Sequence, residues 1–154
     1  MLSSAQNQLN GFIDYLRYER RNSPRTLTAY HQDLLRLSVY CDKRAIGHWS
    51  EVDNYTGRKW LGSLHQHGLS GSSIQRILSG CRSFYRWLIR EQYATANPFD
   101  LLKAPRHPRK LPDTLDIDAV QQLVALKGDD PLTVRDRAIL ELFYSSGLRL
   151  SELV

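Results

Sequence analysis

The sequence is poor in long apolar runs and in cysteine. No apolar stretch reaches the roughly 18 residues that a membrane-spanning helix needs, and the N-terminus has no basic segment followed by a long apolar one. We therefore expect no membrane span and no secretory signal, and we place the protein in the cytoplasm. The two cysteines, Cys41 and Cys81, lie among apolar helical positions. This placement predicts reduced, buried thiols and argues against a disulfide framework.

Motifs for metal and nucleotide sites are also missing. His65 and His67 are two residues apart, so they point to different sides of a helix and make a poor metal pair. The other histidines are scattered along the chain. The segment 68–71 contains two glycines but has neither the lysine nor the spacing of a phosphate-binding loop. We expect no metal and no cofactor.

Acidic residues are fewer than basic ones. Lysine and arginine together number 21 against 16 for aspartate and glutamate, which gives a formal net charge of +5. A basic balance favours an anionic partner such as nucleic acid, although many proteins with a modest excess never meet one. The length of 154 residues suits one domain with room for a second, and 42% hydrophobic residues can supply a core.

What is abundant is helical periodicity. Apolar residues recur with a period near 3.6 and long alternating runs are absent, so we predict an all-α fold. Ser23 followed by Pro24, and Asp130 followed by Pro131, each predict a helix start, and Gly68 predicts a helix end. The expected helices cover about residues 4–20, 24–41, 53–67, 70–90, a short piece after Pro98, 116–126 and 130–146.

The composition changes sharply in residues 104–112. This segment holds three prolines and three basic residues, Arg106, Arg109 and Lys110, without an acidic one. Prolines at that density prevent a helix and favour extended chain. We predict a basic interdomain linker here, which joins an N-terminal bundle of four to five helices at 1–103 to a second domain that begins in 113–154.

Two of the expected helices carry polar faces that suit DNA. In the helix at 70–90, an apolar stripe lies opposite a polar one of small groups and arginines, and the helix at 24–41 repeats the pattern less strongly. Such faces fit the major groove, while the linker's basic residues would lie along the phosphate backbone. An ordinary solvated face is the alternative. The predicted contacts are Arg25, Thr28, Gln32, Arg36, Gln75, Ser79, Arg82, Arg86, Arg106, Arg109 and Lys110.

The C-terminal residues form a second pattern of interest. Gly147 suits the left-handed residue that closes a helix, and Ser151 is placed to cap the next one. Arg149 would then lie in the turn between two helices, where a guanidinium can bind phosphate oxygens in a bidentate manner. Taken alone, the same residue is equally an ordinary surface arginine.

The segments 130–138 (DPLTVRDRA) and 147–154 (GLRLSELV) together resemble the start of the catalytic domain of tyrosine site-specific recombinases. The likeness is to the Xer family, and to its XerC group more than to its XerD sister group. Pieces upstream fit as well, namely 23–27 (SPRTL), 78–85 (LSGCRSFY) and 96–98 (ANP). The resemblance covers essentially the whole chain, and its C-terminal block is the most specific part.

The resemblance implies a SAM-like, core-binding helical domain that binds duplex DNA, followed by a catalytic domain. It assigns Arg149 as the first catalytic arginine and Glu152 as a supporting acid. The nucleophilic tyrosine and the other catalytic groups would lie beyond residue 154, so we expect residues 113–154 to be a truncated start of that domain and this chain alone to be inactive. A second copy of the chain is then expected to cover the apolar residues of 113–154.

For the intact enzyme, the resemblance implies cutting and rejoining of DNA through a phosphotyrosyl intermediate without metal or other cofactor. It also implies a XerD-like sister recombinase, a short chromosomal site at which chromosome dimers are resolved, and control by a DNA translocase of the FtsK type. Three alternatives stay open at the level of sequence. They are an integrase of a phage or mobile element, a non-catalytic helical DNA-binding regulator, and a helical protein-interaction module.

Overall fold

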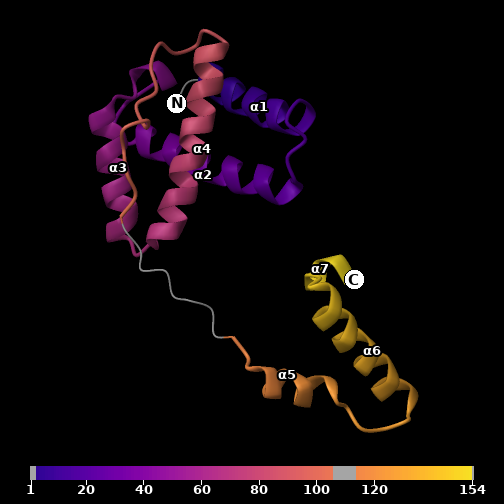
Figure 1. The fold of residues 1–154 in the computed structure, drawn as a ribbon. Helices are drawn as coiled ribbons and strands as arrows, with labels where there is room; N and C mark the ends of the chain where they lie inside the picture. Colours follow the sequence, from indigo (N-terminus) through magenta and orange to yellow (C-terminus); the bar gives the residue numbers. More distant parts are fainter. Residues whose placement is uncertain (1–2, 106–113, 154) are drawn as a thin grey trace. The chain divides into compact units, whose positions relative to one another are not determined.

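The computed structural model describes residues 3–105 and 114–153, which are helical and contain no strand within these ranges (Figure 1). The chain divides into two compact units, Met1–Pro108 and Arg109–Val154. The expectation of an all-α fold is thus confirmed. The helices are α1 (Ser3–Tyr18), α2 (Pro24–Asp42), the 3₁₀ helix η1 (Trp49–Glu51), α3 (Asn54–Gln66), α4 (Gly71–Arg90), α5 (Ile117–Val124), α6 (Pro131–Ser146) and α7 (Leu150–Leu153).

Polar caps start the helices of the first unit where the sequence predicts them. The Ser23 hydroxyl accepts a hydrogen bond from the Thr26 amide (3.3 Å), and Pro24 opens α2. Asp53 and Ser70 play the same role at α3 and α4. Each cap satisfies an amide that the first helical turn leaves without a partner. Gly68 follows α3 with φ +83°, in the left-handed region that glycine adopts without strain.

Two expectations about local structure were wrong. No helix follows Pro98, because the Asn97 side chain takes over the local hydrogen bonds. Its Oδ1 accepts from the Phe99 amide (3.1 Å), and its Nδ2 donates to the Asp100 carboxylate (2.8 Å), which closes a turn instead. The short helix η1 was not expected, since three residues are too few to show a period.

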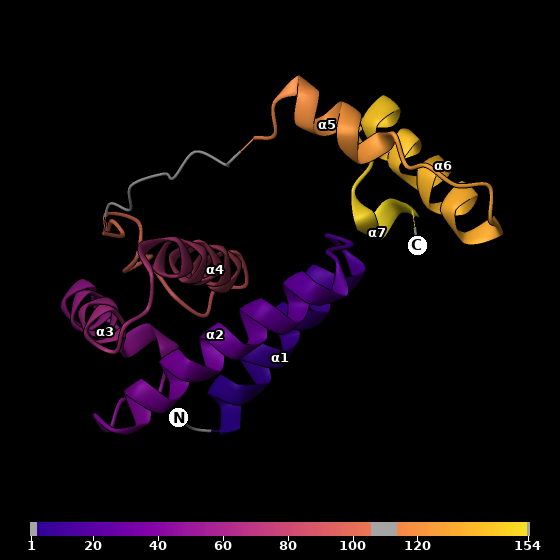
Figure 2. The same ribbon diagram turned by 90° about the horizontal axis from the view of Figure 1, so that it is seen from below.

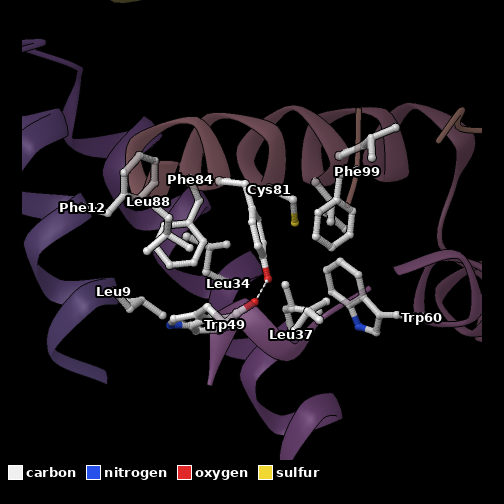
Figure 3. Packing of buried hydrophobic residues seen from close by; sticks show 14 of the residues in the cluster. Leu9, Phe12, Leu34, Leu37, Trp49, Trp60, Cys81, Phe84, Leu88 and Phe99 are labelled. Atoms are coloured by element: carbon white, nitrogen blue, oxygen red, sulfur yellow. Dashed lines mark hydrogen bonds between the residues drawn. The ribbon is translucent and has the colours of Figure 1, made fainter. Parts of the chain in front are cut away.

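The core of the first unit forms around α4, which crosses α2 steeply and also packs against α1 and α3 (Figures 1 and 2). The apolar stripe predicted for α4 is buried in full, and so are the four positions of α1 whose helical spacing predicts that they face inward. These residues are Ile74, Ile77, Leu78, Cys81, Tyr85 and Leu88 in α4, and Leu9, Phe12, Ile13 and Leu16 in α1. Phe84 contacts the rings of Phe12 and Trp49 at 5.2 and 5.0 Å between centroids (Figure 3). Burial of each such side chain contributes about 1.5–3 kcal/mol.

Long-range hydrogen bonds fix the aromatic core. The Tyr85 hydroxyl donates to the carbonyl of Trp49 (2.9 Å; dashed in Figure 3), and the Trp49 indole donates to the carbonyl of Ala5 (2.8 Å). Buried hydroxyl and indole groups need such partners, because an unpaired donor costs free energy. These bonds tie η1 to α1 and α4. The core therefore holds α4 in one orientation.

Both cysteines are buried and unpaired, as the sequence predicts. Burial raises the pKa of the Cys41 thiol to about 11, and it raises the pKa of Cys81 further. Both thiols therefore stay protonated at neutral pH and act as small apolar groups in the core. In the part of the chain that the structure describes, no helix is long and apolar enough to cross a membrane.

The second unit has defined helices but no buried residue among 114–153. Asp116 caps α5, and the Asp130 carboxylate caps α6 by accepting from the amides of Leu132 and Thr133 (3.1 Å each). The Arg137 guanidinium donates to the carbonyl of Leu126 (3.3 Å), which ties α6 to the start of the loop that follows α5. Local hydrogen bonds thus define this unit, while its apolar side chains stay accessible.

Candidate nucleic-acid interface

The polar residues predicted for α2 are on its exposed side. Arg25, Thr28, Gln32 and Arg36 are all exposed. The Thr28 hydroxyl donates to the carbonyl of Pro24 (3.0 Å), so its oxygen keeps only acceptor capacity for an outside group. The arginines supply charge and donors, and Gln32 supplies both a donor and an acceptor. Such a face can contact phosphates and base edges.

The polar stripe of α4 is divided between exposed and partly buried positions. Gln75 and Arg86 are exposed, and Ser79 is half-buried with its hydroxyl donating to the carbonyl of Gln75 (3.0 Å). The Arg86 Nε donates to the carbonyl of Arg82 (3.3 Å), which leaves its two terminal nitrogens available. The exposed members of the stripe can therefore still bind an anion or a base.

A buried ion pair joins the polar faces of α2 and α4. Asp33 is only 1% exposed, and Arg76 holds its carboxyl group in a bidentate pair with Nη2 at 3.3 Å from Oδ1 and Nη1 closer to Oδ2. Arg36 adds a third contact, with Nη1 at 3.6 Å from Oδ1. Two exposed arginines from two helices thus share one carboxyl group. The net charge of these three side chains together is positive.

Neither Asp33 nor Arg76 was among the residues predicted for the interface. Burial raises the pKa of the Asp33 carboxyl, while the two arginines oppose that rise. The missed signal was an aspartate in the apolar phase of α2, directly before the core residue Leu34. A buried acid needs a basic partner, and Arg76 is that partner. We therefore add Arg76 to the candidate interface.

The expectation that Arg82 is free on the exposed face was wrong. Its Nε donates to the carbonyl of Phe99 (3.0 Å), and its Nη2 donates to the carbonyls of Asp100 (3.3 Å) and Leu102. Asn97 also donates to the carbonyl of Arg82 (3.3 Å). The reason is the turn at 97–102, whose carbonyls have no helical partner and receive the guanidinium instead. Arg82 holds this turn against α4.

The linker residues lie outside the described part of the chain. Arg106, Arg109 and Lys110 are the basic residues for which we predict contacts along the phosphate backbone. The structure describes the chain up to Pro105 and again from Thr114. The prediction for these three residues therefore stays a prediction.

The turn after α6 brings Arg149 and Glu152 together. Gly147 has φ +63° and closes α6, as predicted, with its amide donating to the carbonyl of Phe143 (2.9 Å). The Glu152 carboxylate accepts from the Arg149 amide (2.8 Å) and pairs with the Arg149 guanidinium (3.0 Å). The expected cap at Ser151 was wrong, because α7 begins at Leu150 and Ser151 is already inside it.

This arrangement leaves the Arg149 side chain 82% exposed while Glu152 fixes its direction. An exposed guanidinium whose position is fixed in this way can bind a phosphate with its remaining N–H donors. No group of histidine, cysteine or acidic residues that could hold a metal occurs in the described ranges. The two predicted catalytic residues, Arg149 and Glu152, are thus in contact with each other. Both belong to one segment of only four residues in the second unit.

Comparison with known proteins identifies the family of this chain. Residues 9–92, which include most of α1 and all of α2, η1, α3 and α4, match the family described as phage integrase, N-terminal SAM-like domain. The tyrosine recombinase XerC of Pseudomonas aeruginosa (strain LESB58) is 46% identical over 147 residues, which are 95% of this chain and 48% of that protein.

Two further relatives carry the same name. Tyrosine recombinase XerC of Xanthomonas axonopodis pv. citri (strain 306) is 43% identical over 96% of this chain and 52% of its own length. That of Azotobacter vinelandii (strain DJ / ATCC BAA-1303) is 45% identical over 97% and 50%, respectively. The chain spans about half the length of the curated relatives it matches. The resemblance drawn from the sequence is thereby confirmed, and the chain belongs to the family of the phage integrase N-terminal SAM-like domain.

Proposed function

We propose that this protein is a XerC-like site-specific tyrosine recombinase and that the chain binds duplex DNA through α2 and α4. The observation that carries the proposal is the convergence of two exposed arginines from these helices on one buried aspartate, inside the region that matches the integrase family. That convergence fixes a basic surface on a rigid scaffold. Residues 1–103 would be the core-binding domain, 104–112 the linker, and 113–154 the start of the catalytic domain.

DNA binding follows from the chemistry of this surface. Arg25, Arg36, Arg76 and Arg86 supply positive charge, which releases counterions from the phosphate backbone. Gln32 and Gln75 offer amide groups that can pair with adenine edges in the major groove. Backbone contacts set the position of the domain on the duplex, and the few amide and hydroxyl groups supply sequence preference.

Strand cleavage is the proposed role of the second unit together with the other catalytic groups of the intact enzyme. A tyrosine oxygen attacks the phosphorus, a phosphotyrosyl bond forms, and the deoxyribose hydroxyl leaves; the reverse reaction with another strand's hydroxyl rejoins the DNA. Arg149 would stabilise the charge that develops on the phosphate oxygens, and Glu152 would hold Arg149 in place. The 154 residues alone lack that tyrosine in our proposal, and we expect no cleavage from them.

The partners in this proposal are a XerD-like recombinase at a shared chromosomal site, where chromosome dimers are resolved, and an FtsK-type DNA translocase that controls the reaction. Such a substrate places the protein in the cytoplasm. The exposed apolar residues of 114–153 need a covering surface, and we propose a second copy of the chain for the 154-residue form.

Binding is tested by titrating labelled duplex at several salt concentrations. If five to seven phosphates are contacted, the slope of log K against log salt should be about −4 to −6. Arg36→Ala should flatten the slope, whereas Arg58→Ala on α3 serves as a control because it removes the same charge elsewhere. An affinity that does not change with salt would refute the proposal of a DNA-binding face.

Catalysis is tested separately in the intact enzyme. Arg149→Ala should leave binding nearly unchanged and lower cleavage of a suicide substrate by about 10²-fold or more, the scale for loss of one transition-state donor. Arg36→Ala should weaken DNA binding, so cleavage should fall when the enzyme is limiting. Cleavage should be nearly unchanged when the enzyme saturates the DNA. Normal cleavage by the Arg149→Ala enzyme would remove the active-site assignment.

A further inference from the structure

A hollow between α1 and α4 collects three arginines. It has a volume of about 310 Å³ and is lined by Tyr15, Arg20, Ser83, Arg86, Trp87 and Arg90, without a carboxylate among them. We call it the α1–α4 hollow. Arg20 comes from the chain just after α1, and the other two arginines lie one helical turn apart on α4. Cations from two elements share one concave surface.

Arg90 is held in a fixed position at the edge of the hollow. Its Nε pairs with Glu91 (2.9 Å) and its Nη1 with Glu19 (3.4 Å). Its guanidinium also lies 4.3 Å from the centroid of the Tyr15 ring. These contacts compensate much of its charge, and they order the rim. Arg90 is therefore more a wall of the hollow than its principal anion ligand.

Arg20 and Arg86 are the available ligands. The Arg20 amide donates to the carbonyl of Tyr15 (3.1 Å), which fixes its backbone at the end of α1. No ion pair of either side chain occurs within residues 3–105 and 114–153, and Arg86 uses only its Nε, toward the carbonyl of Arg82. Two guanidinium groups and the Ser83 hydroxyl can thus donate to one tetrahedral anion.

The position of the hollow along α4 indicates the source of that anion. Gln75 and Arg86 are 11 residues apart, or about 16 Å along the helix. The major groove is about 12 Å wide. If the N-terminal half of α4 with Gln75 and Ser79 lies in the groove, its C-terminal end reaches the phosphates at the groove edge.

We propose that the α1–α4 hollow is a phosphate site for the DNA backbone, with Arg20 and Arg86 as its ligands. The inference rests on the proposed function, since it assumes that α4 faces duplex DNA. It adds a contact from the end of α1, which supplied none of the residues predicted from the sequence. A phosphate bound there fixes how far α4 enters the groove and contributes affinity without sequence information.

The test compares Arg20→Gln and Arg86→Gln, alone and together, with Arg58→Gln on α3 as the matched control. The whole chain is titrated with duplex from 50 to 200 mM salt. Loss of one phosphate contact should reduce the salt slope by about 0.9 and weaken binding at 50 mM salt by about tenfold, equally for all sequences. The double variant should lose no more than the stronger single one if both ligands serve one phosphate.

Single methylphosphonate substitutions in the duplex identify the phosphate itself. Substitution at one particular phosphate should weaken DNA binding by the unaltered protein. The same substitution should not weaken DNA binding by the double variant any further. If the double variant keeps full affinity and slope while Arg36→Gln loses both, the hollow is not a DNA site, although the proposed function stands. Inorganic phosphate that perturbs Ser83 and Arg86 resonances, with DNA affinity unchanged in the double variant, would likewise overturn the proposal in favour of a small-anion site.

Discussion

The two units of the molecule are stabilised in different ways. Every buried apolar side chain of the described residues lies between Ala5 and Leu102, and the second unit has none. Its helices are instead stabilised by caps and local hydrogen bonds, and its apolar side chains remain accessible. The exposed large apolar residues of the second unit are Leu115, Ile117, Leu123, Leu132, Val134, Leu142, Tyr144 and Leu150.

This difference separates the two kinds of site. The residues of the proposed DNA-binding face come from α2 and α4, which a shared core and the Asp33–Arg76 pair hold together. Arg149 and Glu152 are positioned by residues within the same turn. A site that joins distant segments requires a core, whereas a site built from four consecutive residues can form through local hydrogen bonds alone.

The largest expected effect comes from matched leucine truncations in the two units. Leu78→Ala removes a fully buried side chain of α4 and should cost about 2–5 kcal/mol of unfolding free energy. Leu142→Ala removes a 41% exposed one and should stay within about 0.5 kcal/mol. Urea denaturation followed by tryptophan fluorescence reports on the first unit, which holds all three tryptophans, and far-UV circular dichroism reports on the helices of both units. Equal losses would show that the units share one core.

Removal of the shared carboxylate should separate stability from binding. Asp33→Asn places a buried amide N–H against the donors of Arg76, which should cost about 1–3 kcal/mol of unfolding free energy. The same change leaves Arg36 and Arg76 without their counter-charge, so DNA affinity at low salt should rise. Denaturation and duplex titration on one preparation test the two opposite directions. A fall in affinity together with stability would mean that the pair only supports the fold.

The same variant should change the pH dependence of stability. Because burial places the folded pKa of Asp33 above its unfolded value of about 3.9, the protonated form favours folding. This contribution is fully present below the unfolded pKa and is lost as the pH rises through the folded pKa. In Asp33→Asn the stability should be flatter over that window, as urea midpoints from pH 3.5 upward would show.

Loss of the Arg82 contacts should loosen the end of the first unit without unfolding it. Arg82→Gln removes the guanidinium donors to the carbonyls of Phe99 and Asp100, so we expect cleavage by trypsin after Lys103 to accelerate by about tenfold, which corresponds to about 1.4 kcal/mol of local opening. Cleavage at Arg25 on α2 is the internal control and should not change. Acceleration at both places would indicate global destabilisation.

The smallest effect is expected for alanine substitution of two glycines that both have a positive φ. Gly68 and Gly147 have φ of +83° and +63°, and alanine at either position should cost about 1 kcal/mol locally. Only Gly68→Ala should lower the urea midpoint of the first unit. Gly62→Ala within α3 has open space and ordinary helical geometry, so it should be neutral or slightly stabilising. A shift caused by Gly147→Ala would again couple the units.

Local features of the fold could be read from the sequence, and long-range contacts could not. Ser23, Asp53, Ser70 and Asp130 cap the helices because capping needs only the next three residues. The apolar stripes predicted the buried faces of α1 and α4. The turn at Asn97 and the helix η1 were missed because side-chain competition and very short elements leave no periodic signal.

The site shows the same limit. The exposure of Arg25, Gln32, Arg36, Gln75 and Arg86 agrees with the helical phase. Arg82 has the same phase but binds carbonyls 17 to 20 residues away, and Arg76 binds an acid 43 residues away. Periodicity states which way a residue faces, but it does not state which group lies in front of it.

The contacts of Arg82 also give the first unit a mechanical property. The chain that continues toward residue 105 is attached near the middle of α4 through one guanidinium and the Asn97 amide, and Phe99 packs between Trp60 and Tyr85 in the core. A pulling force applied beyond Pro105 is therefore borne by α4 itself rather than by the end of that helix. Because α4 also carries the proposed DNA contacts Gln75 and Arg86, we expect a force applied at Pro105 and DNA binding by this helix to influence each other.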